Sequence, residues 1–501
     1  MLRQTYLGQK GYTIMKDSIS IDEQIQIKAD LNVKPNLPGN MGKSVSFPIY
    51  RESPKKLYVP RFYGEKNFGC ADQNKLSSGD PINVEFSGSL RPFQTDVINK
   101  YLTHVKSGKN GIGGGLLEIG CGKGKTVMAL NIISQLRVKT LVIVHKGFLL
   151  NQWVERIQQF LPTARIGKIQ GPHFDIEDKD IVIGMLQSLS MKEYPQELFS
   201  SFGFVCVDEC HHISAEVFVR SLFVAVTPYV LGLSATMQRK DGLSKVFKHF
   251  IGGMVHSEKN DTTTEVEVRG IEYYVEDDEF NNIRTDYRGN PLYSCMISKL
   301  CDYASRTEFI LGVLKDVLRE NNQQQIIMLA HNKNLLNYIY KAIIDRNIAD
   351  GSIGYYIGGM KDKDLKVSET KTIIMATYSM AAEALDIKSL TTLFMLTPKT
   401  DVQQAVGRIL RVKHSKPLVV DFVDAHGIFQ NQWKKRKTFY KKQNYRVIYT
   451  DNRNYVSDTT QWKVVNDPTK TPAKKKPKIC VSSDDDNPKN KCLVTPDMLS
   501  Q

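Results

Sequence analysis

Short apolar runs alternate with amphipathic helical stretches from about residue 90 onward, and this alternation constrains the fold more than any other feature of the chain. The first set of runs is "GLLEIG", "TLVIVH", "DIVIGM", "FVCVDE" and "YVLGLSAT". Helical stretches such as "TVMALNIISQLR" and "NQWVERIQQFL" separate them. Strands that are apolar along nearly their whole length are buried on both faces. The pattern therefore predicts an α/β fold with a parallel sheet covered by helices.

A second set of such runs predicts a second α/β domain in tandem with the first. These runs are "QIIMLA", "IGYYIGG", "TIIMAT", "TLFMLTP" and "PLVVDFVD". The segment between the two sets is polar and rich in turn residues, and we expect it to be an interdomain connection with some local strand. The basic C-terminal tail is too polar to bury a core, so we expect the tail to be disordered. The expected division is 1–88 accessory region, 89–255 first domain, 256–304 interdomain connection, 305–450 second domain and 451–501 tail.

Composition narrows the class of protein. The chain is 41% apolar and 24% charged, contains no run of 18 apolar residues, and has no apolar signal core at its N-terminus. We therefore expect neither a membrane span nor secretion. Its eight cysteines show no disulfide pattern, which indicates reduced thiols in an intracellular compartment. A net charge of +15 favours a polyanionic partner, with nucleic acid the first expectation and an acidic protein the second.

The run "EIGCGKGKTVMAL" at 118–130 has the order of a phosphate-binding loop: a strand, a glycine-rich turn and a helix. Backbone amides at the helix start would face the phosphates, Lys125 would reach the β and γ oxygens, and the Thr126 hydroxyl would ligate Mg²⁺. A stricter pattern has glycine where this chain has Ile119. The residues that we expect to bind the nucleotide here are Gly122, Lys123, Gly124, Lys125 and Thr126.

The run "FGFVCVDECHHISAEVF" at 202–218 delivers an acidic pair to the end of an apolar strand. Beside a phosphate loop, Asp208 would hold Mg²⁺ through its water shell, and Glu209 would orient and deprotonate the attacking water. Two other interpretations stay open. The carboxylates could simply cap the strand, or the nearby zinc-type ligands could form a metal site. Those ligands are Cys206, Cys210, His211 and His212.

With these two motifs, residues 88–448 resemble the superfamily 2 helicases. "DECH" is similar to that family's Walker B box, and "LSATMQRKDG" looks like motif III with the extension seen in the XPB-like branch. "LRPFQ" resembles the adenine-contacting segment, "TLVIVHKGFLLNQW" motif Ia, and "IVIGMLQSL" the next nucleic-acid-contacting motif. "ATYSMAAEALDI" looks like motif V and "QQAVGRILR" like motif VI. The runs "LYVPRFYG", "MISKLCDYASRTEFIL" and "KKRKTFYKKQNY" look most like helicases of large nucleocytoplasmic DNA viruses.

The resemblance implies two RecA-like domains that bind ATP and Mg²⁺ between them, and it assigns roles residue by residue. Phe93 and Gln94 would contact adenine, and Asp386 would contribute to nucleotide binding. The coupling segment would be Ser234, Ala235 and Thr236. The residues expected to contact nucleic acid are Lys146, Gln187, Arg239, Thr377 and Glu383. The chain departs from the family at His145, where proline is common, and at Ala384, where glycine is common.

Arg408 and Arg411 lie three residues apart, so on a helix they would share a face and could both reach across an interdomain cleft. Together with Gln404 they would stabilise charge on the transferred phosphate. The run at 433–449 carries seven basic residues among aromatic ones, a mixture that suits phosphate neutralisation and base stacking, although a solvated amphipathic helix has the same pattern. Trp153 is expected in the core.

The sequence therefore predicts an ATP-dependent nucleic-acid helicase or translocase, with DNA favoured over RNA. The viral resemblance implies a role in transcription, such as transcript release, or in repair and recombination. An RNA helicase, a non-catalytic nucleic-acid-binding protein and a motor subunit of a larger complex are the alternatives. The expected location is a reducing intracellular one: the host cytoplasm, at a virus factory, the virion, or the nucleus, for which "KKKPK" is a weak signal.

Overall fold

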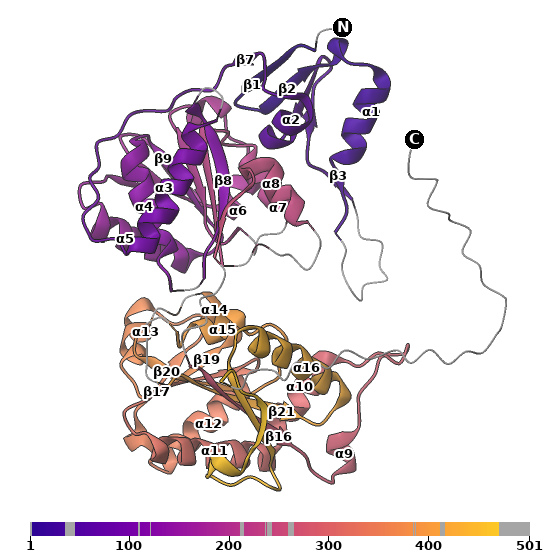
Figure 1. Ribbon diagram of the computed structural model, residues 1–501, viewed down its shortest axis with the longest axis vertical. Helices are drawn as coiled ribbons and strands as arrows, with labels where there is room; N and C mark the ends of the chain where they lie inside the picture. The colour runs from indigo at the N-terminus through magenta and orange to yellow at the C-terminus, as the bar shows by residue number, and fades with distance from the viewer. Residues whose placement is uncertain are drawn as a thin grey trace, which may run out of the picture.

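The computed structural model describes residues 3–35, 46–108, 111–120, 122–210, 215–235, 237, 243–258, 265–383, 385, 387–410 and 416–469. These residues form an N-terminal region and two α/β domains, each built around an eight-stranded, mostly parallel sheet (Figure 1). The expected pair of tandem RecA-like domains is therefore confirmed. None of the described helices is both long and apolar enough to cross a membrane.

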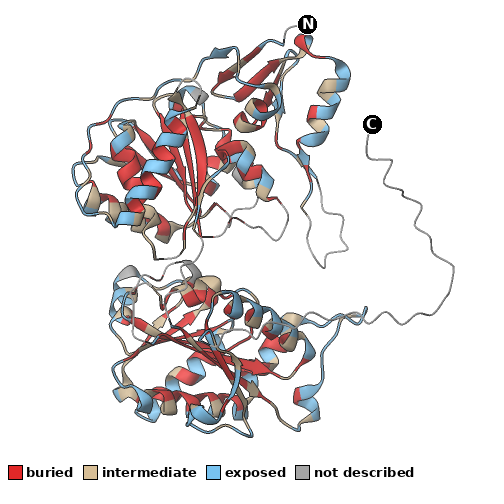
Figure 2. Ribbon diagram, viewed as in Figure 1, coloured by how far each residue is buried: buried red, intermediate tan, exposed pale blue. Residues whose placement is uncertain are grey.

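The first domain has the strand order β11-β10-β12-β9-β13-β14-β8-β15, and only β10 and β11 pair antiparallel. Its strands are β8 (Gly113–Glu118), β9 (Thr140–Val144), β10 (Ile166–Gln170), β11 (His173–Asp175), β12 (Ile181–Met185), β13 (Phe204–Val207), β14 (Tyr229–Ser234) and β15 (Met254–Ser257). Its helices are α3 (Pro92–Lys106), α4 (Lys125–Leu136), α5 (Gly147–Phe160), α6 (Leu186–Met191), α7 (Ala215–Leu222) and α8 (Ser244–Ile251). Every residue of β9 and β13 is buried, as Figure 2 shows for the centre of the sheet.

The second domain has the order β18-β19-β17-β20-β21-β16-β22-β23, and only β22 and β23 pair antiparallel. Its strands are β16 (Glu267–Tyr273), β17 (Gln325–Ala330), β18 (Ile353–Tyr356), β19 (Ile373–Thr377), β20 (Leu390–Met395), β21 (Leu418–Asp424), β22 (Arg446–Asp451) and β23 (Lys463–Asn466). Its helices are α9 (Asp278–Asn281), α10 (Tyr293–Asp302), α11 (Ala304–Glu320), α12 (Lys333–Asp345), α13 (Asp362–Glu369), α14 (Tyr378–Glu383), α15 (Gln403–Gly407) and α16 (Gly427–Lys442).

The structure corrects the expected boundaries of the interdomain connection. β15 pairs with β8 in the first sheet, and β16 lies inside the second sheet between β21 and β22. β16 was not recognised because charged residues interrupt its apolar pattern. Arg269 is almost fully buried, with its guanidinium 2.8 Å from the Glu320 carboxylate and 2.9 Å from Glu267. Ion pairing allows this polar segment to be an interior strand.

The expected start of the tail, residue 451, is also wrong. The chain continues in ordered form from β22 to β23, and Trp462 is buried in the core of the second domain. Tyr455 packs between Phe309 and Trp462, and β23 pairs with β22, so aromatic packing and strand pairing hold this otherwise polar segment against the sheet. Residues 470–501, with "KKKPK", lie outside the described residues.

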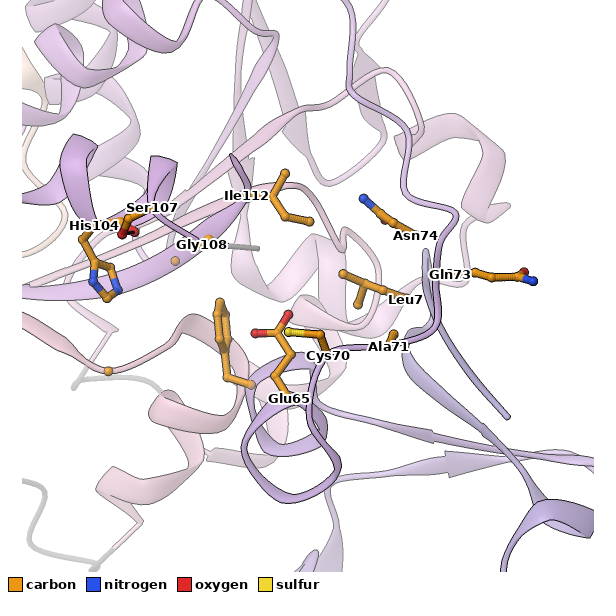
Figure 3. A pocket seen from close by; sticks show the side chains of 14 residues that line it. Leu7, Glu65, Cys70, Ala71, Gln73, Asn74, His104, Ser107, Gly108 and Ile112 are labelled. Carbon is orange, nitrogen blue, oxygen red and sulfur yellow. Dashed lines mark hydrogen bonds between the residues drawn. The ribbon is translucent and has the colours of Figure 1, made fainter. Parts of the chain in front are cut away.

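The N-terminal region forms its own five-stranded sheet, with the order β5-β6-β2-β1-β7. Its elements are β1 (Thr5–Gly8), β2 (Gly11–Met15), α1 (Ile21–Asp30), β3 (Asn32–Val33), β4 (Phe47–Pro48), β5 (Arg51–Glu52), β6 (Lys56–Val59), α2 (Arg61–Phe68) and β7 (Gln73–Asn74). A pocket of about 340 Å³ marks its junction with the first domain, and its lining includes Leu7 and Cys70 of the N-terminal region and Gly113 at the start of β8. Figure 3 shows Leu7, Cys70 and Ile112 around this pocket. The region therefore docks at the amino end of the first sheet.

Buried ion pairs fix helices to the second sheet. The Arg436 guanidinium of α16 makes two hydrogen bonds to Asp421 of β21, at 2.7 and 2.9 Å, and both side chains are fully buried. Arg306 of α11 makes the same kind of pair with Asp424, at 2.6 and 3.0 Å.

This packing corrects part of the expectation for 433–449. The buried side chains Trp433, Arg436, Tyr440 and Tyr445 belong to the core and do not form a base-stacking surface. The exposed basic residues of the run are Lys434, Lys435, Lys441, Lys442 and Arg446.

We predict that Arg436→Ala lowers the free energy of unfolding of the second domain by about 3–5 kcal/mol, because it leaves the Asp421 carboxylate buried without its cation. Urea unfolding followed by tryptophan fluorescence measures this, since Trp433 and Trp462 both lie in that domain. The control Lys435→Ala, at an exposed position of the same helix, should stay within about 0.5 kcal/mol of the wild type. Equal losses in the two variants would contradict the prediction.

Candidate nucleotide and nucleic-acid sites

The glycine-rich turn lies between β8 and α4, as the sequence predicts. Gly122 and Gly124 adopt φ values of 76° and 85°, which glycine reaches without strain. A Cβ atom on Gly124 would lie 2.4 Å from Nε2 of Gln94, so a larger residue would have to displace this side chain as well as adopt a strained φ. The turn leads into the first amides of α4, which begins at Lys125, and a helix start of this kind favours an anion. Thr126 follows, half-buried, in the first turn of the helix.

Gln94 holds this turn from behind. Its buried side chain donates a hydrogen bond from Nε2 to the Lys123 carbonyl oxygen at 3.0 Å, and its Oε1 accepts one from the Arg91 backbone N–H at 2.9 Å. The residue therefore ties the start of α3 to the phosphate loop. Phe93 is half-buried in the first turn of the same helix. Contact of either side chain with adenine stays a prediction.

The acidic pair lies beside the same turn. Nζ of Lys125 is 2.8 Å from Oε1 of Glu209, and both side chains are largely buried. Glu209 has a φ of 48°, in the left-handed region, a conformation that costs a non-glycine residue about 1–3 kcal/mol. This bend directs the Glu209 backbone N–H to Oδ1 of Asp208 at 3.0 Å. The loops after β8 and β13 therefore meet through one ion pair.

Trp153 of α5 reaches the other oxygen of Asp208. Its Nε1 donates to Oδ2 at 2.9 Å, and the indole is only 1% exposed. The expectation that Trp153 lies in the core is confirmed, but its contact with Asp208 was not foreseen. Burial, and after it the neighbouring Glu209 carboxylate, raise the pKa of Asp208 to about 6 against the opposing effects of Lys125 and the indole N–H. Asp208 is thus a buried carboxylate with a hydrogen-bond donor on each oxygen.

The coupling segment lies on the strand between these two loops. Ser234 ends β14, which pairs with β13 on one side and β8 on the other, and its carbonyl oxygen accepts the Ile119 backbone N–H at 2.9 Å. Ser234 and Ala235 are buried, whereas Thr236 and Arg239 lie outside the described residues.

Two carboxylates that sequence reasoning missed connect this edge of the sheet. Oε1 of Glu118 accepts the Met237 backbone N–H at 2.8 Å, and its Oε2 accepts the Ser257 hydroxyl at 2.6 Å. Glu258 pairs with the Lys123 ammonium and accepts the Gly120 N–H at 3.3 Å. Glu118 could have been found from the sequence, because it is an acidic residue inside the apolar run "GLLEIG". Glu258 could not, because it lies in a polar run where an acidic residue is ordinary.

Two of the three nucleic-acid residues expected in the first domain, Lys146 and Gln187, follow neighbouring parallel strands, β9 and β12. Lys146 is half-buried at the start of α5, and Gln187 is exposed. Nε2 of Gln187 donates to the His145 carbonyl oxygen at 3.0 Å, which joins these two loops. Because parallel strands end at one sheet edge, both residues lie on the same edge as Asp208.

The second-domain residues gather on α14, α15 and the end of β19, on the side nearest the first domain in Figure 1. Arg408 is buried and donates from its guanidinium to the Leu385 carbonyl oxygen at 2.8 Å. Gln404 and Thr377 are half-buried, and Glu383 is the last residue of α14. Arg411 and Asp386 lie outside the described residues.

Contacts between the two α/β domains are sparse in the described part of the chain. Lys366 of α13 lies 3.5 Å from Glu155 of α5, and both side chains are exposed, so the pair contributes little. Phe148 packs partly against the apolar cores of both domains. No extensive helix or strand contact joins the two domains among the described residues.

The described residues give no support to the interpretation of this segment as a zinc site. No group of three or more potential metal ligands occurs among the described residues, and Cys206 and Cys210 are buried free thiols. His211 and His212 lie outside the described residues.

Comparison with known proteins identifies the family. Residues 87–239 match the family model of the type III restriction enzyme res subunit. A protein of Acanthamoeba polyphaga mimivirus that bears the name of an ATP-dependent RNA helicase is 32% identical over 473 residues, which cover 92% of this chain and 89% of the relative. A protein of African swine fever virus with the same type of name is 27% identical, over 66% of this chain and 69% of its own length.

A solved structure supports the fold alone. The fragment of an HsdR subunit of a type I restriction enzyme from Vibrio vulnificus is 16% identical, with a TM-score of 0.52, over 73% of this chain and 70% of that one. The mimivirus relative matches nearly the whole chain at a higher identity. The chain therefore belongs to the superfamily 2 helicases, which are ATP-dependent enzymes, in the group that includes these proteins of large DNA viruses.

Proposed function

We propose that this helicase hydrolyses ATP at the carboxyl edge of its first sheet, with Lys125, Thr126, Asp208 and Glu209 as the central groups. The observation that carries the proposal is the 2.8 Å contact between Lys125 and Glu209, next to the buried Asp208 carboxylate. A phosphate-binding lysine and a candidate base come from loops far apart in sequence and meet at one point. A structural ion pair alone would not require the two left-handed glycines and the helix start without a side-chain cap beside it.

The ion pair also suggests how nucleotide binding prepares hydrolysis. Without phosphate, the Lys125 ammonium and the Glu209 carboxylate neutralise each other. A triphosphate brings several negative charges to the helix start and competes for the lysine. Glu209 is then released to accept a hydrogen bond from the attacking water and to take its proton. The base is thus held in position and ionised until its substrate arrives.

Thr126 and Asp208 are the residues that would hold Mg²⁺. A hydroxyl and a carboxylate are the oxygen ligands that this ion prefers, directly or through water. When bound, Mg²⁺ would neutralise negative charge on the phosphates. Trp153 is a positioning residue in this proposal, because its N–H fixes the rotation of the Asp208 carboxylate inside a buried site.

The second domain would supply Gln404, Arg408 and Arg411. Arg408 donates to the Leu385 carbonyl oxygen, a neutral acceptor that a phosphate oxygen can replace. Closure of the two domains on ATP would bring the arginines to the transferred phosphate, where arginine fingers accelerate hydrolysis by about 10³- to 10⁵-fold. Among the residues that the structure describes, few contacts between the domains would have to break during this movement.

We propose DNA as the track, contacted by Lys146, Gln187 and Arg239 in the first domain and by Thr377 and Glu383 in the second. The match to the res subunit of restriction enzymes and the extension after motif III support DNA. The names of the viral relatives favour RNA as the second candidate. We propose that the protein acts in an intracellular complex, either in transcript release or in repair and recombination.

The variant Glu209→Gln should retain ATP binding and lose about 10²- to 10⁴-fold in the rate of hydrolysis, because the amide keeps the shape of the side chain but cannot take a proton. ATP binding and steady-state turnover of the full chain measure the two effects. Glu216→Gln, on the exposed face of α7, provides the control. Unchanged turnover in Glu209→Gln would remove Glu209 from the role of base.

Trp153→Phe should raise the Mg²⁺ concentration needed for half-maximal ATPase activity by about tenfold, because Asp208 loses the donor that orients it. Nucleotide binding measured without Mg²⁺ should stay close to that of the wild type. Trp433→Phe removes a buried indole from the second domain and controls for general loosening of a core. If Trp153→Phe and Trp433→Phe need the same Mg²⁺ concentration for half-maximal activity, Trp153 does not position Asp208 for Mg²⁺ binding.

The nature of the track is tested by ATPase stimulation with single-stranded DNA, duplex DNA, branched DNA and RNA. We expect DNA to stimulate turnover at least tenfold more than RNA, and stimulation to weaken steeply with salt because phosphate contacts release counterions. Glu209→Gln provides a background without turnover for the corresponding binding measurements. If only RNA stimulates ATPase activity, the track is RNA and the choice of DNA is wrong.

A further inference from the structure

The N-terminal sheet has one face that carries its apolar core and a second face that is only partly exposed. On this second face Tyr6 is half-buried, Tyr58 is 9% exposed and Thr13 is fully buried. At its edge the Arg51 guanidinium lies 4.7 Å from the centre of the Phe223 ring of the first domain. The first face carries apolar side chains that pack against α1, α2 and the first domain. These side chains are Tyr12, Ile14, Leu57 and Val59. Because side chains alternate along a strand, the residues between them point to the opposite face.

On the opposite face, strand register aligns one residue from each of the five strands. Tyr6 pairs with Thr13 and with Gln73, Thr13 pairs with Tyr58, and Tyr58 pairs with Arg51. The result is a row across β5-β6-β2-β1-β7 in which two tyrosines flank a small threonine. We call Tyr6 and Tyr58, together with the lysines that cover them, the tyrosine–lysine face.

Three lysines lie over the two rings. The ammonium groups of Lys75 and Lys56 are 4.5 and 5.3 Å from the centre of the Tyr6 ring, and Lys56 also donates to the Tyr6 hydroxyl at 3.2 Å. Lys10 lies 5.4 Å from the centre of the Tyr58 ring. None of the three lysines makes an ion pair within the described part of the chain.

The acids nearest to this face are engaged elsewhere. Oδ2 of Asp72, next to β7, accepts the Thr5 backbone N–H at 2.8 Å and the Thr5 hydroxyl at 3.0 Å. Glu52 of β5 pairs with Lys16 and Lys28 at 2.6 and 2.8 Å. Neither acid is ion-paired with the three lysines, whose ammonium groups lie above two aromatic rings.

We propose that the tyrosine–lysine face binds a single strand of DNA, as a contact separate from the two RecA-like domains. The lysines would bind successive phosphates, and their movement from the rings to the phosphates would uncover Tyr6 and Tyr58 for base stacking. The choice of DNA rests on the proposed function. A protein partner is less suited, because a row of lysines without acids or a wide apolar surface lacks the core of a protein interface.

The test compares single-stranded DNA binding by the full chain and by the charge-reversed variant K10E/K56E/K75E over a range of salt concentrations. We expect affinity to fall at least tenfold at low salt, and the slope of log affinity against log salt to decrease by about 2, as the loss of three phosphate contacts predicts. Basal ATPase activity should not change, because the face lies at the opposite end of the first domain from Lys125.

A matched control carries the same charge change elsewhere. K106E/K315E/K341E alters lysines on α3, α11 and α12, so it separates position from net charge. A second variant, Tyr6→Leu, keeps the lysines and should lower affinity about five- to a hundredfold with an unchanged salt slope, because it removes stacking alone.

The outcomes separate this inference from the proposed function. Equal binding by K10E/K56E/K75E and its control overturns the tyrosine–lysine face as a DNA site. A loss confined to RNA binding overturns the choice of DNA. A wild-type chain that binds no nucleic acid in any nucleotide state contradicts the proposed function itself.

Discussion

The hydrogen-bonded order of the first sheet is the constraint on which the candidate ATP site depends. β13, β14 and β8 are parallel neighbours, so the acidic pair, the coupling segment and the phosphate loop all leave the sheet at one edge. Three contacts follow from this order: Lys125 with Glu209, Ile119 with Ser234, and Glu118 with Met237. Each joins loops that are distant in sequence. A shift in strand register would separate all three at once.

The sequence alone predicted the features that only a few residue types can form. Strands buried on both faces are nearly continuous apolar runs, and a glycine-rich turn before Lys125 has few other uses. Prediction from the sequence failed where contacts with distant residues allow a charged or polar segment to be buried. β16 reads as a polar linker because Arg269 and its acids are paired only in the fold, and Trp433 reads as surface because α16 is so rich in lysine. The Trp153–Asp208 bond joins separate elements, so no local pattern could reveal it.

Among the described residues, buried ion pairs hold the second domain together, whereas few contacts join it to the first, and this contrast suits a motor. In the second domain, β21 carries both Asp421 and Asp424 in its interior, and each is matched by a buried arginine from a different helix. Breaking either pair is costly, so α11 and α16 are fixed to the sheet. Between the domains, the exposed Lys366–Glu155 pair offers no comparable resistance. Nucleotide binding energy can therefore move whole domains without deforming them.

The two ends of β8 contact different parts of the protein. Its amino end, at Gly113, meets the N-terminal region, and its carboxyl end leads to the phosphate loop. The strand has six residues, which span about 20 Å. A DNA strand held by the N-terminal region is therefore too far from Lys125 to take part in the chemistry. Its effect would be to raise the local concentration of track beside the motor domains, as a tethered second binding site does. Such a site would increase the number of steps taken before release and leave the rate of each hydrolysis unchanged.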